Sequence, residues 1–396
     1  MRELLKKLAP NKAKELYRKL RAMFIRGLFA FFSHLPIEKK RIVLCNVWGY
    51  GDNPKWIARA LRMCDKSLEI VFVAGGVRNH TANGIHFVPN NSIAAAYYLS
   101  TAHVWVDCNR KEPYISKREG QFYVQTWHGS IPLKKIEGDY EGLTKEYLEN
   151  AYRDSAMTDL YISNGSFMES IYARAFRYSG RCLRAGSARL DPLFKPNTRR
   201  VYNLKKKLKE YAGISINDDI GVAVYAPTFR DKKTKGYEEP DYKGIIESLE
   251  EKYGKEFVLI IRNHPIEAKH IHGLHSGKLV DGNSFGDLYE ILEVADVLIT
   301  DYSNTMFEFA LTEKPVFLYA PDADEYTDER GMYFEYESLP FPKASDSLEL
   351  CRAIEEYKAE TYVPLQKKFY EELGIKEEGH ASVTIAKVII SKAYNH

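Results

Sequence analysis

His128 has the residue type and the setting of a group that could activate a substrate. It stands in QTWHGS, directly after the strand-like run 122–124 and before Lys134 and Lys135. An imidazole can take up a proton near neutral pH, and Gly129 would let a substrate approach the backbone. A structural role is the alternative for a single histidine. Its place after a strand, beside a glycine and near lysines, favours a functional role.

Two further motifs follow apolar runs in the second half of the chain. YAPTFRD contains Thr228 and Arg230, whose hydroxyl and guanidinium are suited to phosphate oxygens. An ion pair of Arg230 with Asp231 or another carboxylate is the alternative for this motif. RNHP follows the next apolar run, and its proline ends the strand and leaves His264 at the tip.

Clustered histidines raise the question of a metal site. His270, His272 and His275 come soon after His264, but no carboxylate or cysteine joins them at a recognised ligand spacing. The five cysteines show no paired spacing, which argues against a zinc site or a disulfide framework and fits a reducing cytoplasm. We therefore predict no metal site.

A fourth motif combines a strand, a polar turn and a helix. The run 297–300 leads through DYSN into a helix predicted over 305–311. Ser303 is the expected N-cap, and the free amide hydrogens at that helix start would form an anion site for a diphosphate. Glu308 could accept hydrogen bonds from ribose hydroxyls, with an exposed helix carboxylate as the alternative. The later segment EYTDERGMYF could bring Arg330 to the same phosphates.

Charge and absent motifs disfavour several function classes. The formal net charge of +3 over 396 residues is small for a general nucleic-acid binder. No glycine-rich loop ends in GK[ST], which disfavours nucleotide hydrolysis of that kind. No clear GxGxxG follows a strand, so hydride transfer on a dinucleotide loses most of its support.

The elements that must position these motifs alternate between short apolar runs and helical patterns, which is typical of βα units and parallel sheets. Ligands of such sheets bind beyond the carboxyl ends of the strands, where the motifs stand. A polar, proline-containing stretch interrupts the pattern at 191–198. The length of the chain predicts two domains, which we place as open α/β units at 37–195 and 196–396. The predicted strands are 42–45, 70–73, 104–106, 122–125, 160–163, 222–225, 257–261, 297–300 and 315–319.

Residues 1–36 form a basic and then apolar segment. Its uncharged stretch 27–37 is far shorter than the roughly 20 residues that cross a bilayer, and no signal-peptide cleavage pattern follows. Helical spacing gathers one set of apolar residues on one side, with lysines and arginines elsewhere. The set is Leu5, Leu8, Leu16, Leu20 and Phe24. We predict an amphipathic helix on an anionic membrane surface. A basic helix packed on the protein's own core is the alternative.

Taken together and in order, the motifs resemble the CDP-glycerol glycerophosphotransferase family of teichoic-acid primases and polymerases. The match covers about residues 125–334 through WHGSIPLKKIEGD, YAPTFRD, RNHP, TDYSNTMFE and EYTDERGMYF. The chain departs from the family pattern at Asn304, where a second serine is expected, and at Glu308, where many relatives have an aspartate. Neither departure removes an amide donor or a carboxylate.

The resemblance implies a GT-B architecture, in which two Rossmann-like domains face each other across a cleft. The acceptor would approach from the first domain, and the second would hold most of the nucleotide. His128 would be the general base, and His264 would lie near the transferring phosphate. The implied nucleotide- and phosphate-binding positions are Thr228, Arg230, Asp301, Ser303, Asn304, Glu308 and Arg330. The implied acceptor-side positions are Trp127, Gly129, Lys134 and Lys135.

The implied reaction is in-line attack of an acceptor hydroxyl on the distal phosphorus of CDP-glycerol, with release of CMP. It requires no metal and no other cofactor. The acceptor would be a saccharide linked to polyprenyl diphosphate, at the cytoplasmic face of the cell membrane, and no nucleic-acid partner is expected. The length of the chain favours a primase-like or single-addition enzyme over a polymerase.

Three alternatives stay open at this point. A transferase that uses CDP-ribitol would carry the same motifs. A GT-B glycosyltransferase or epimerase that uses a nucleotide sugar would share the fold and the nucleotide cradle. A noncatalytic membrane-bound scaffold would also keep the fold, although retention of both His128 and His264 speaks against it.

Overall fold

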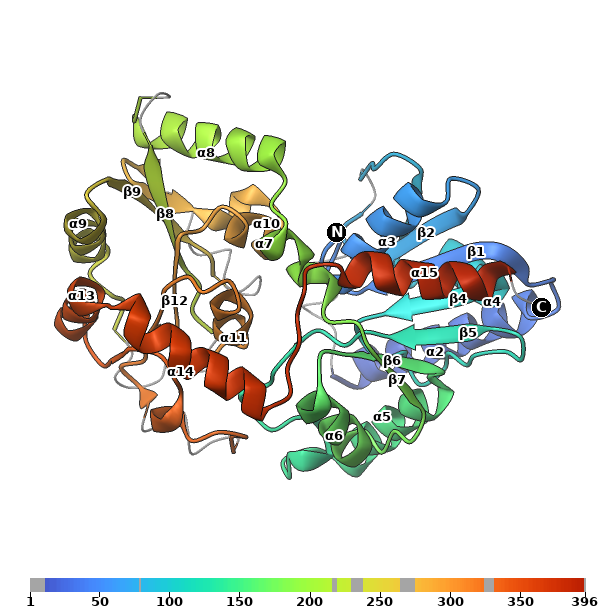
Figure 1. Cartoon of the computed structure of the whole chain (residues 1–396). Helices are drawn as coiled ribbons and strands as arrows, with labels where there is room; N and C mark the ends of the chain where they lie inside the picture. The colour runs from blue at the N-terminus through green and yellow to red at the C-terminus, as the bar shows by residue number, and fades with distance from the viewer. Residues whose placement is uncertain are drawn as a thin grey trace.

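Two β-sheets, each covered by helices, organise the chain into two lobes (Figure 1). The computed structural model describes residues 11–77, 80–215, 219–228, 238–263, 275–323 and 331–394. The predicted tandem of open α/β units is confirmed by these two sheets. Each predicted strand is present.

The first lobe contains a parallel sheet in the order β3-β2-β1-β4-β5-β6-β7. Its central strands are continuous apolar runs because helices cover both faces. Side chains alternate along a strand, so Ile42 and Leu44 pack under α3 and α15, whereas Val43 and Cys45 pack with α4 and α2. The strands are β1 (Glu38–Asn46), β2 (Glu69–Ala74), β3 (Ile85–Pro89), β4 (Ala102–Asp107), β5 (Phe122–Gln125), β6 (Leu160–Ser163) and β7 (Arg181–Arg184). The helices are α2 (Asn11–Phe32), α3 (Asp52–Cys64), α4 (Ile93–Thr101), α5 (Lys145–Met157) and α6 (Ser166–Ala175).

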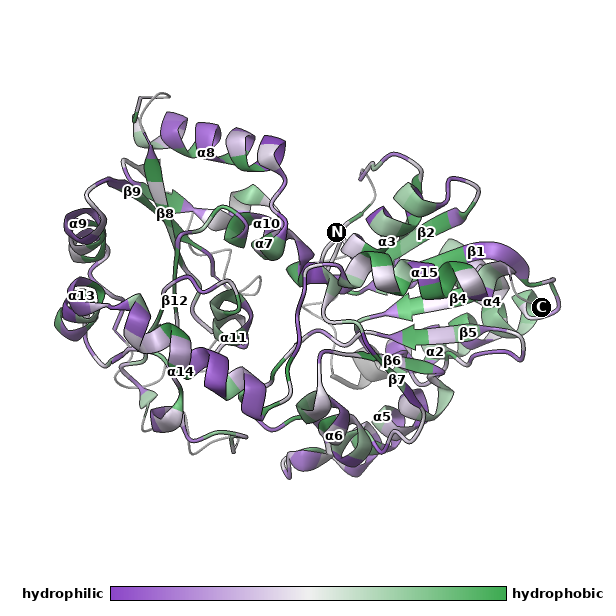
Figure 2. Ribbon diagram, viewed as in Figure 1, coloured by the Kyte–Doolittle hydropathy of each residue, from purple (hydrophilic) through white to green (hydrophobic). Residues whose placement is uncertain are grey.

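The second lobe contains a sheet in the order β10-β11-β9-β8-β12-β13-β14, parallel except for the β10–β11 pair. On the outside of this lobe, α8 turns a hydrophilic side outward (Figure 2), whereas α11 is buried along its whole length. The strands are β8 (Ile220–Tyr225), β9 (Glu256–Ile261), β10 (His275–Ser276), β11 (Leu279–Asp281), β12 (Val297–Thr300), β13 (Val316–Tyr319) and β14 (Lys343–Ala344). The helices are α8 (Thr198–Ala212), α9 (Tyr242–Tyr253), α10 (Leu288–Leu292), α11 (Thr305–Ala310), α13 (Ser347–Glu356) and α14 (Ala359–Glu372).

Both sheets reverse their strand order beside the strand that opens the lobe, between β1 and β4 and between β8 and β12. Such a reversal leaves a crevice at the carboxyl ends of the two strands, where ligands bind. In the first lobe, the segments 47–52, 108–110 and 126–130 lie at this edge. In the second lobe, the segments 226–228 and 301–304 lie there. The fold therefore presents one candidate edge on each lobe.

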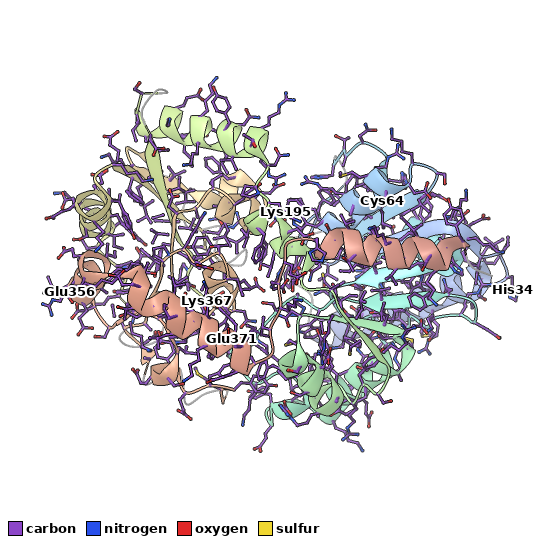
Figure 3. The ribbon with its side chains drawn as sticks, viewed as in Figure 1. His34, Cys64, Lys195, Glu356, Lys367 and Glu371 are labelled. Carbon is purple, nitrogen blue, oxygen red and sulfur yellow. The ribbon has the colours of Figure 1, made fainter. Side chains whose placement is uncertain are left out.

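The chain crosses between the lobes twice (Figure 1). The first crossing runs through η2 (Ala188–Leu190) and α7 (Asp191–Phe194) to α8, and Lys195 marks it in Figure 3. The second crossing leaves α14 and ends in α15 (Ala381–Tyr394), which packs on α3 and β1. The prediction that 196–396 forms one domain is therefore wrong for residues 381–394. Their apolar side completes the core of the first lobe.

Hydrogen bonds tie the two crossings together. The carboxylate of Asp191 accepts hydrogen bonds from the backbone amides of Ala381 and Ser382, at 2.9 and 2.8 Å. The carboxylate of Glu377 accepts the backbone amide of Ser187 with both oxygens, each at 3.0 Å. The start of α15 is therefore held against the first crossing.

Helix α2 packs against α4 and presents its other side to solvent. Ile25 is buried. The ring of Phe32 packs edge-on against that of Tyr97, with 5.5 Å between the ring centroids. Residues 1–10, which include part of the predicted amphipathic segment, lie outside the described residues. None of the helices described here has the length and apolar character needed to span a membrane.

We expect Ile389→Ala to destabilise the first lobe, although its position is near the C-terminal end of the sequence. Ile389 is fully buried in the core shared by α15 and α3, and truncating such a side chain costs about 2–5 kcal/mol. Hydrogen exchange should therefore quicken in peptides of β1 and α3. The matched variant Ile354→Ala, which truncates a fully buried side chain of α13 in the second lobe, should quicken exchange there instead. The same exchange pattern in both variants would contradict the assignment of α15.

Candidate active site

The loop after β5 places His128 at the edge of the first lobe. It does so through a backbone conformation that residues other than glycine rarely adopt. Trp127 has a φ of +53°, and a residue held in this region costs about 1–3 kcal/mol. The side-chain amide of Asn53 donates to the Trp127 carbonyl at 3.0 Å. The backbone amide of Trp127 donates to the side-chain oxygen of Gln125 at 2.9 Å. The indole is buried and the imidazole is exposed as a result.

His128 is oriented to accept a proton through Nε2. Its Nδ1 lies 2.9 Å from the backbone oxygen of Cys108, and a carbonyl can only accept, so Nδ1 carries the hydrogen. The lone pair of the neutral ring is therefore on Nε2. Loss of hydration among the surrounding protein atoms lowers the pKa of His128, and the cations Arg189 and Arg110 act in the same direction. The neutral, proton-accepting ring prevails at pH 7.

Arg189 contacts the backbone of the loop that carries His128. Its Nη1 donates to the His128 carbonyl at 2.8 Å and to the carboxylate of Asp52 at 3.0 Å. Its backbone amide donates to the side chain of Asn53 at 3.0 Å. Asp52 and Asn53 begin α3 at the carboxyl end of β1. The segment after β1 and the loop after β5 are thus joined through one guanidinium.

The loop that carries His128 also touches the polar turn of the second lobe. The backbone amide of Leu133 donates to the side chain of Asn304 at 3.1 Å. A Cβ on Gly129 would lie 3.0 Å from the Asn304 amide nitrogen, so the absence of a side chain permits this approach. Two motifs that are far apart in the sequence therefore form one site. Trp127 and Gly129 of the predicted acceptor side lie on the first-lobe side of it.

Glu308 does not face an open space where ribose could bind. It is fully buried, and its two oxygens accept hydrogen bonds from Arg189 and from the hydroxyl of Tyr289. The backbone amide of Ser130 donates to the same carboxylate at 3.1 Å. Neither the predicted ribose contact nor the exposed helix carboxylate describes this arrangement. Glu308 instead connects the second lobe to the loop that carries His128.

The start of α11 also differs from the prediction. The helix begins at Thr305, and Asn304 rather than Ser303 occupies the N-cap position. The amides of Met306 and Phe307 donate to the backbone oxygens of Ser303 and Asn304, at 3.1 Å each. The amide of Thr305 donates to the Ser303 hydroxyl at 3.3 Å. These first-turn amides are therefore engaged within the protein and are not the free donors that we expected.

Asp301 and Thr228 are brought together at the strand reversal of the second sheet. The carboxylate of Asp301 accepts the amide of Thr228 at 2.9 Å and its hydroxyl at 2.5 Å. It also accepts the amide of Tyr302 at 2.6 Å. Asp301 is buried and Thr228 is half-buried. Asp301 thus fixes the turn after β8, and Thr228 is the nearer of the two to solvent.

Lys134 and Lys135 lie on a short ladder with the segment 331–333. The amide of Lys135 donates to the Gly331 oxygen at 3.1 Å, and the amide of Tyr333 donates to the Leu133 oxygen at 2.8 Å. The side chain of Lys134 is half-buried and that of Lys135 is exposed. The PLKK and RGMYF motifs are therefore neighbours, which the sequence order alone did not show.

Several predicted site residues lie outside the described part of the chain. They are His264, Arg230 and Arg330, and their predicted roles stay predictions. His270 and His272, for which we predict no metal site, also lie outside the described residues. Among the residues that the structure does describe, no group of three or more histidine, cysteine or acidic side chains could hold a metal ion.

Sequence reasoning missed Asp52, Arg189 and Tyr289. Asp52 follows the first strand at its carboxyl end, so the rule that located His128 could have located it. Arg189 follows β7, whose short run RCLR gives no apolar strand signal, and Tyr289 lies in the short helix α10. Only their tertiary contacts reveal them.

Comparison with known proteins gives relatives over nearly the whole chain. A family model described as CDP-Glycerol:Poly(glycerophosphate) glycerophosphotransferase matches residues 27–391. The chain is 28% identical to a teichoic acid poly(glycerol phosphate) polymerase of Bacillus subtilis, over 96% of this chain and 52% of that protein. It is 28% identical to a teichoic acid glycerol-phosphate transferase of Staphylococcus aureus, over 95% of this chain and 99% of that protein.

The chain thus spans about half the length of the first of these relatives. A solved structure of the wall teichoic acid polymerase TagF superposes with a TM-score of 0.79 at 25% identity, covering 97% of this chain and 99% of that chain. The predicted GT-B architecture is confirmed by this superposition.

We expect the imidazole of His128 to titrate below its ordinary pKa and to carry its hydrogen on Nδ1 when neutral. The surrounding protein atoms remove part of the hydration of the ring and so lower the pKa, and the Cys108 carbonyl selects the tautomer. Nitrogen-15 NMR of histidine-labelled protein, with His128→Gln to identify the signal, measures both properties. A ring that titrates above pH 6.5, or that is protonated on Nε2 when neutral, would contradict this geometry.

Proposed function

The chain belongs to the CDP-glycerol:poly(glycerophosphate) glycerophosphotransferase family. From this premise we propose that it is a transferase of teichoic-acid synthesis, which adds glycerol phosphate from CDP-glycerol to a lipid-linked saccharide. The observation that carries the proposal is the neutral His128, whose Nε2 can accept a proton beside the polar turn of the second lobe. The acceptor then lies on the first-lobe side and the nucleotide on the second-lobe side.

The reaction follows from this placement. Nε2 of His128 takes the proton of the acceptor hydroxyl as its oxygen attacks the distal phosphorus of CDP-glycerol. The bond between the acceptor oxygen and this phosphorus forms, and the bond from the phosphorus to the bridging oxygen breaks. CMP leaves with the electron pair of that bond. By resemblance, Arg230, His264 and Arg330 stabilise the phosphate charge.

The polyol and the number of additions are finer parts of the proposal. The relatives named for glycerol phosphate support glycerol over ribitol. A primase-like or single addition is the mode that we propose. The acceptor is a saccharide on polyprenyl diphosphate at the cytoplasmic face of the membrane, where the enzyme is peripheral.

Helix α2 supplies the surface that we propose for membrane contact. The apolar side chains of one helical stripe are exposed and point away from the buried Ile25, whereas soluble proteins seldom gather so many on one face. Basic side chains flank this stripe on both sides, as expected for contact with anionic lipid. The exposed apolar members are Leu16, Tyr17, Leu20, Met23, Phe24 and Phe31. The flanking basic members are Lys19, Arg21 and Arg26.

A donor comparison tests the function. The protein is incubated with a lipid-linked disaccharide analogue and, in parallel, with CDP-glycerol, CDP-ribitol or UDP-glucose, and products are identified by mass spectrometry. We expect CMP release and a mass increase of one glycerol phosphate with CDP-glycerol. Products with CDP-ribitol alone would support the ribitol alternative, and release of UDP would support a sugar transferase.

We expect His128→Ala to lower kcat by about 10²–10⁴-fold, because the general base is lost, while the Kd for CDP-glycerol changes little. In the native enzyme the low pKa of His128 keeps the base neutral at pH 7, so activity should fall only as pH drops through that pKa. The control is His86→Ala, at an exposed histidine of β3 on the far edge of the first sheet. Lost nucleotide binding with residual transfer would refute the role of His128.

We expect the double variant Met23→Asn, Phe24→Asn to bind anionic vesicles at least about ten-fold more weakly, because a buried large apolar side chain contributes about 1.5–3 kcal/mol. Deletion of residues 1–36 should weaken sedimentation with vesicles further. Tyr202→Asn, which changes an exposed aromatic residue of α8, is the control. Equal sedimentation of all these proteins would rule out α2 as the membrane contact.

A further inference from the structure

We propose that Arg189 is a positioning residue that couples the contact between the lobes to the placement of His128. The inference rests on the proposed function, because it assigns His128 the role of the base. Arg189 does not touch the reacting atoms. It acts through the backbone of the loop that carries His128.

The guanidinium of Arg189 donates hydrogen bonds to three separate acceptor residues. Nη1 donates to the His128 carbonyl and to the Asp52 carboxylate, which are both in the first lobe. Nη2 donates to Glu308, which belongs to α11 of the second lobe. Because a guanidinium is planar and rigid, the position of one acceptor constrains the other two. A shift of Glu308 would therefore move the His128 carbonyl.

The second-lobe end of this link is fixed as firmly. Glu308 is fully buried, and a buried carboxylate needs partners for both oxygens. Tyr289 donates to one oxygen, and Arg189 and the Ser130 amide share the other. Ser130 lies two residues after His128, so Glu308 contacts the loop directly at Ser130 and, through Arg189, at the His128 carbonyl.

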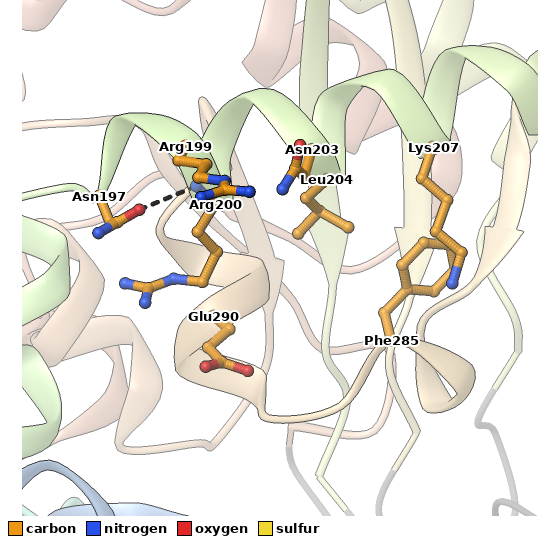
Figure 4. Close-up of a pocket in the computed structure, with 8 residues that line it drawn as sticks. All are labelled: Asn197, Arg199, Arg200, Asn203, Leu204, Lys207, Phe285 and Glu290. Carbon is orange, nitrogen blue, oxygen red and sulfur yellow. Dashed lines mark hydrogen bonds between the residues drawn. The ribbon is translucent and has the colours of Figure 1, made fainter. Parts of the chain in front are cut away.

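A second ion-pair cluster joins the lobes without touching this loop, which allows a matched comparison. Lys55 of α3 pairs with Asp287 at 3.1 Å and with Glu290 at 3.0 Å, and Arg59 pairs with Glu290 at 3.3 Å. Glu290 also lines a depression of about 470 Å³ beside α8 (Figure 4). This cluster joins the lobes, but none of its ion pairs involves the loop that carries His128, which Arg189 contacts.

The test compares Glu308→Gln and Arg189→Lys with Glu290→Gln. Gln keeps the shape of Glu308 and removes its charge. Lys keeps the charge of Arg189 but lacks the planar fork that spans acceptors in both lobes. We expect kcat for glycerol-phosphate transfer to fall by about 100-fold in both variants, as for a misplaced catalytic group, while the Kd for CDP-glycerol stays similar. Glu290→Gln should keep kcat. An equal loss of kcat in Glu290→Gln, or an unchanged kcat in Glu308→Gln, overturns the proposal.

A second readout does not depend on activity. The charged groups that face His128 are Asp52, Arg189 and Arg110, besides the Cys108 carbonyl. Arg189→Gln removes a cation and leaves Asp52 unneutralised, so the NMR titration of His128 should move to higher pH, whereas Glu290→Gln should leave it unchanged. An unmoved titration in Arg189→Gln overturns the proposal. If native protein releases no CMP from CDP-glycerol but the titration moves as expected, the proposed function fails and the positioning role stands.

Tyr289→Phe covers the case in which the charge variants do not fold. It removes only the hydroxyl that donates to Glu308. We expect a smaller decrease of kcat in the same direction, with thermal unfolding close to that of the native protein. An unchanged kcat in this variant counts against the proposal.

Discussion

The buried ion pair between Arg189 and Glu308 is the contact on which the geometry of the site depends. A charge removed from water is tolerated only when partners surround it, so neither group can lose the other without a large cost. This requirement holds the start of α11 against the loop after β5. The site therefore exists as a unit only while the two lobes are in contact, although each lobe has its own sheet and core.

A second constraint acts within the first lobe. The chain must leave β5 and turn at once, and Trp127 does so in the left-handed region. The strain is offset by burial of the indole, which packs edge-on against Phe176 at 4.7 Å, and by hydrogen bonds from Asn53 and to Gln125. Segments from three strands thus determine where one imidazole lies, and a substrate meets a ring that is already oriented.

The sequence predicted the parts of the site that depend on strand ends. His128, Thr228 and Asp301 were found because the carboxyl ends of parallel strands share one edge of a sheet. The burial of Glu308 could not be predicted, since an acidic residue on a helix is usually exposed and its partner Arg189 is distant in the chain. The apolar residues of α15 repeat at helical spacing, but such periodicity does not say which of two sheets a helix covers. The edge strands β7 and β14 are short and partly exposed, so they lack the continuous apolar signal of the central strands.

The two chain crossings have a mechanical consequence. Asp191 and Glu377 bind the crossings into one narrow connection, so the second lobe is attached along a line rather than at a point. A body held in this way keeps rotation about that line and loses sliding and twisting. Any opening that admits a nucleotide is then a hinge motion about a fixed axis. Motion about this axis would separate Glu308 from Arg189 and Ser130 and bring it back to the same contacts.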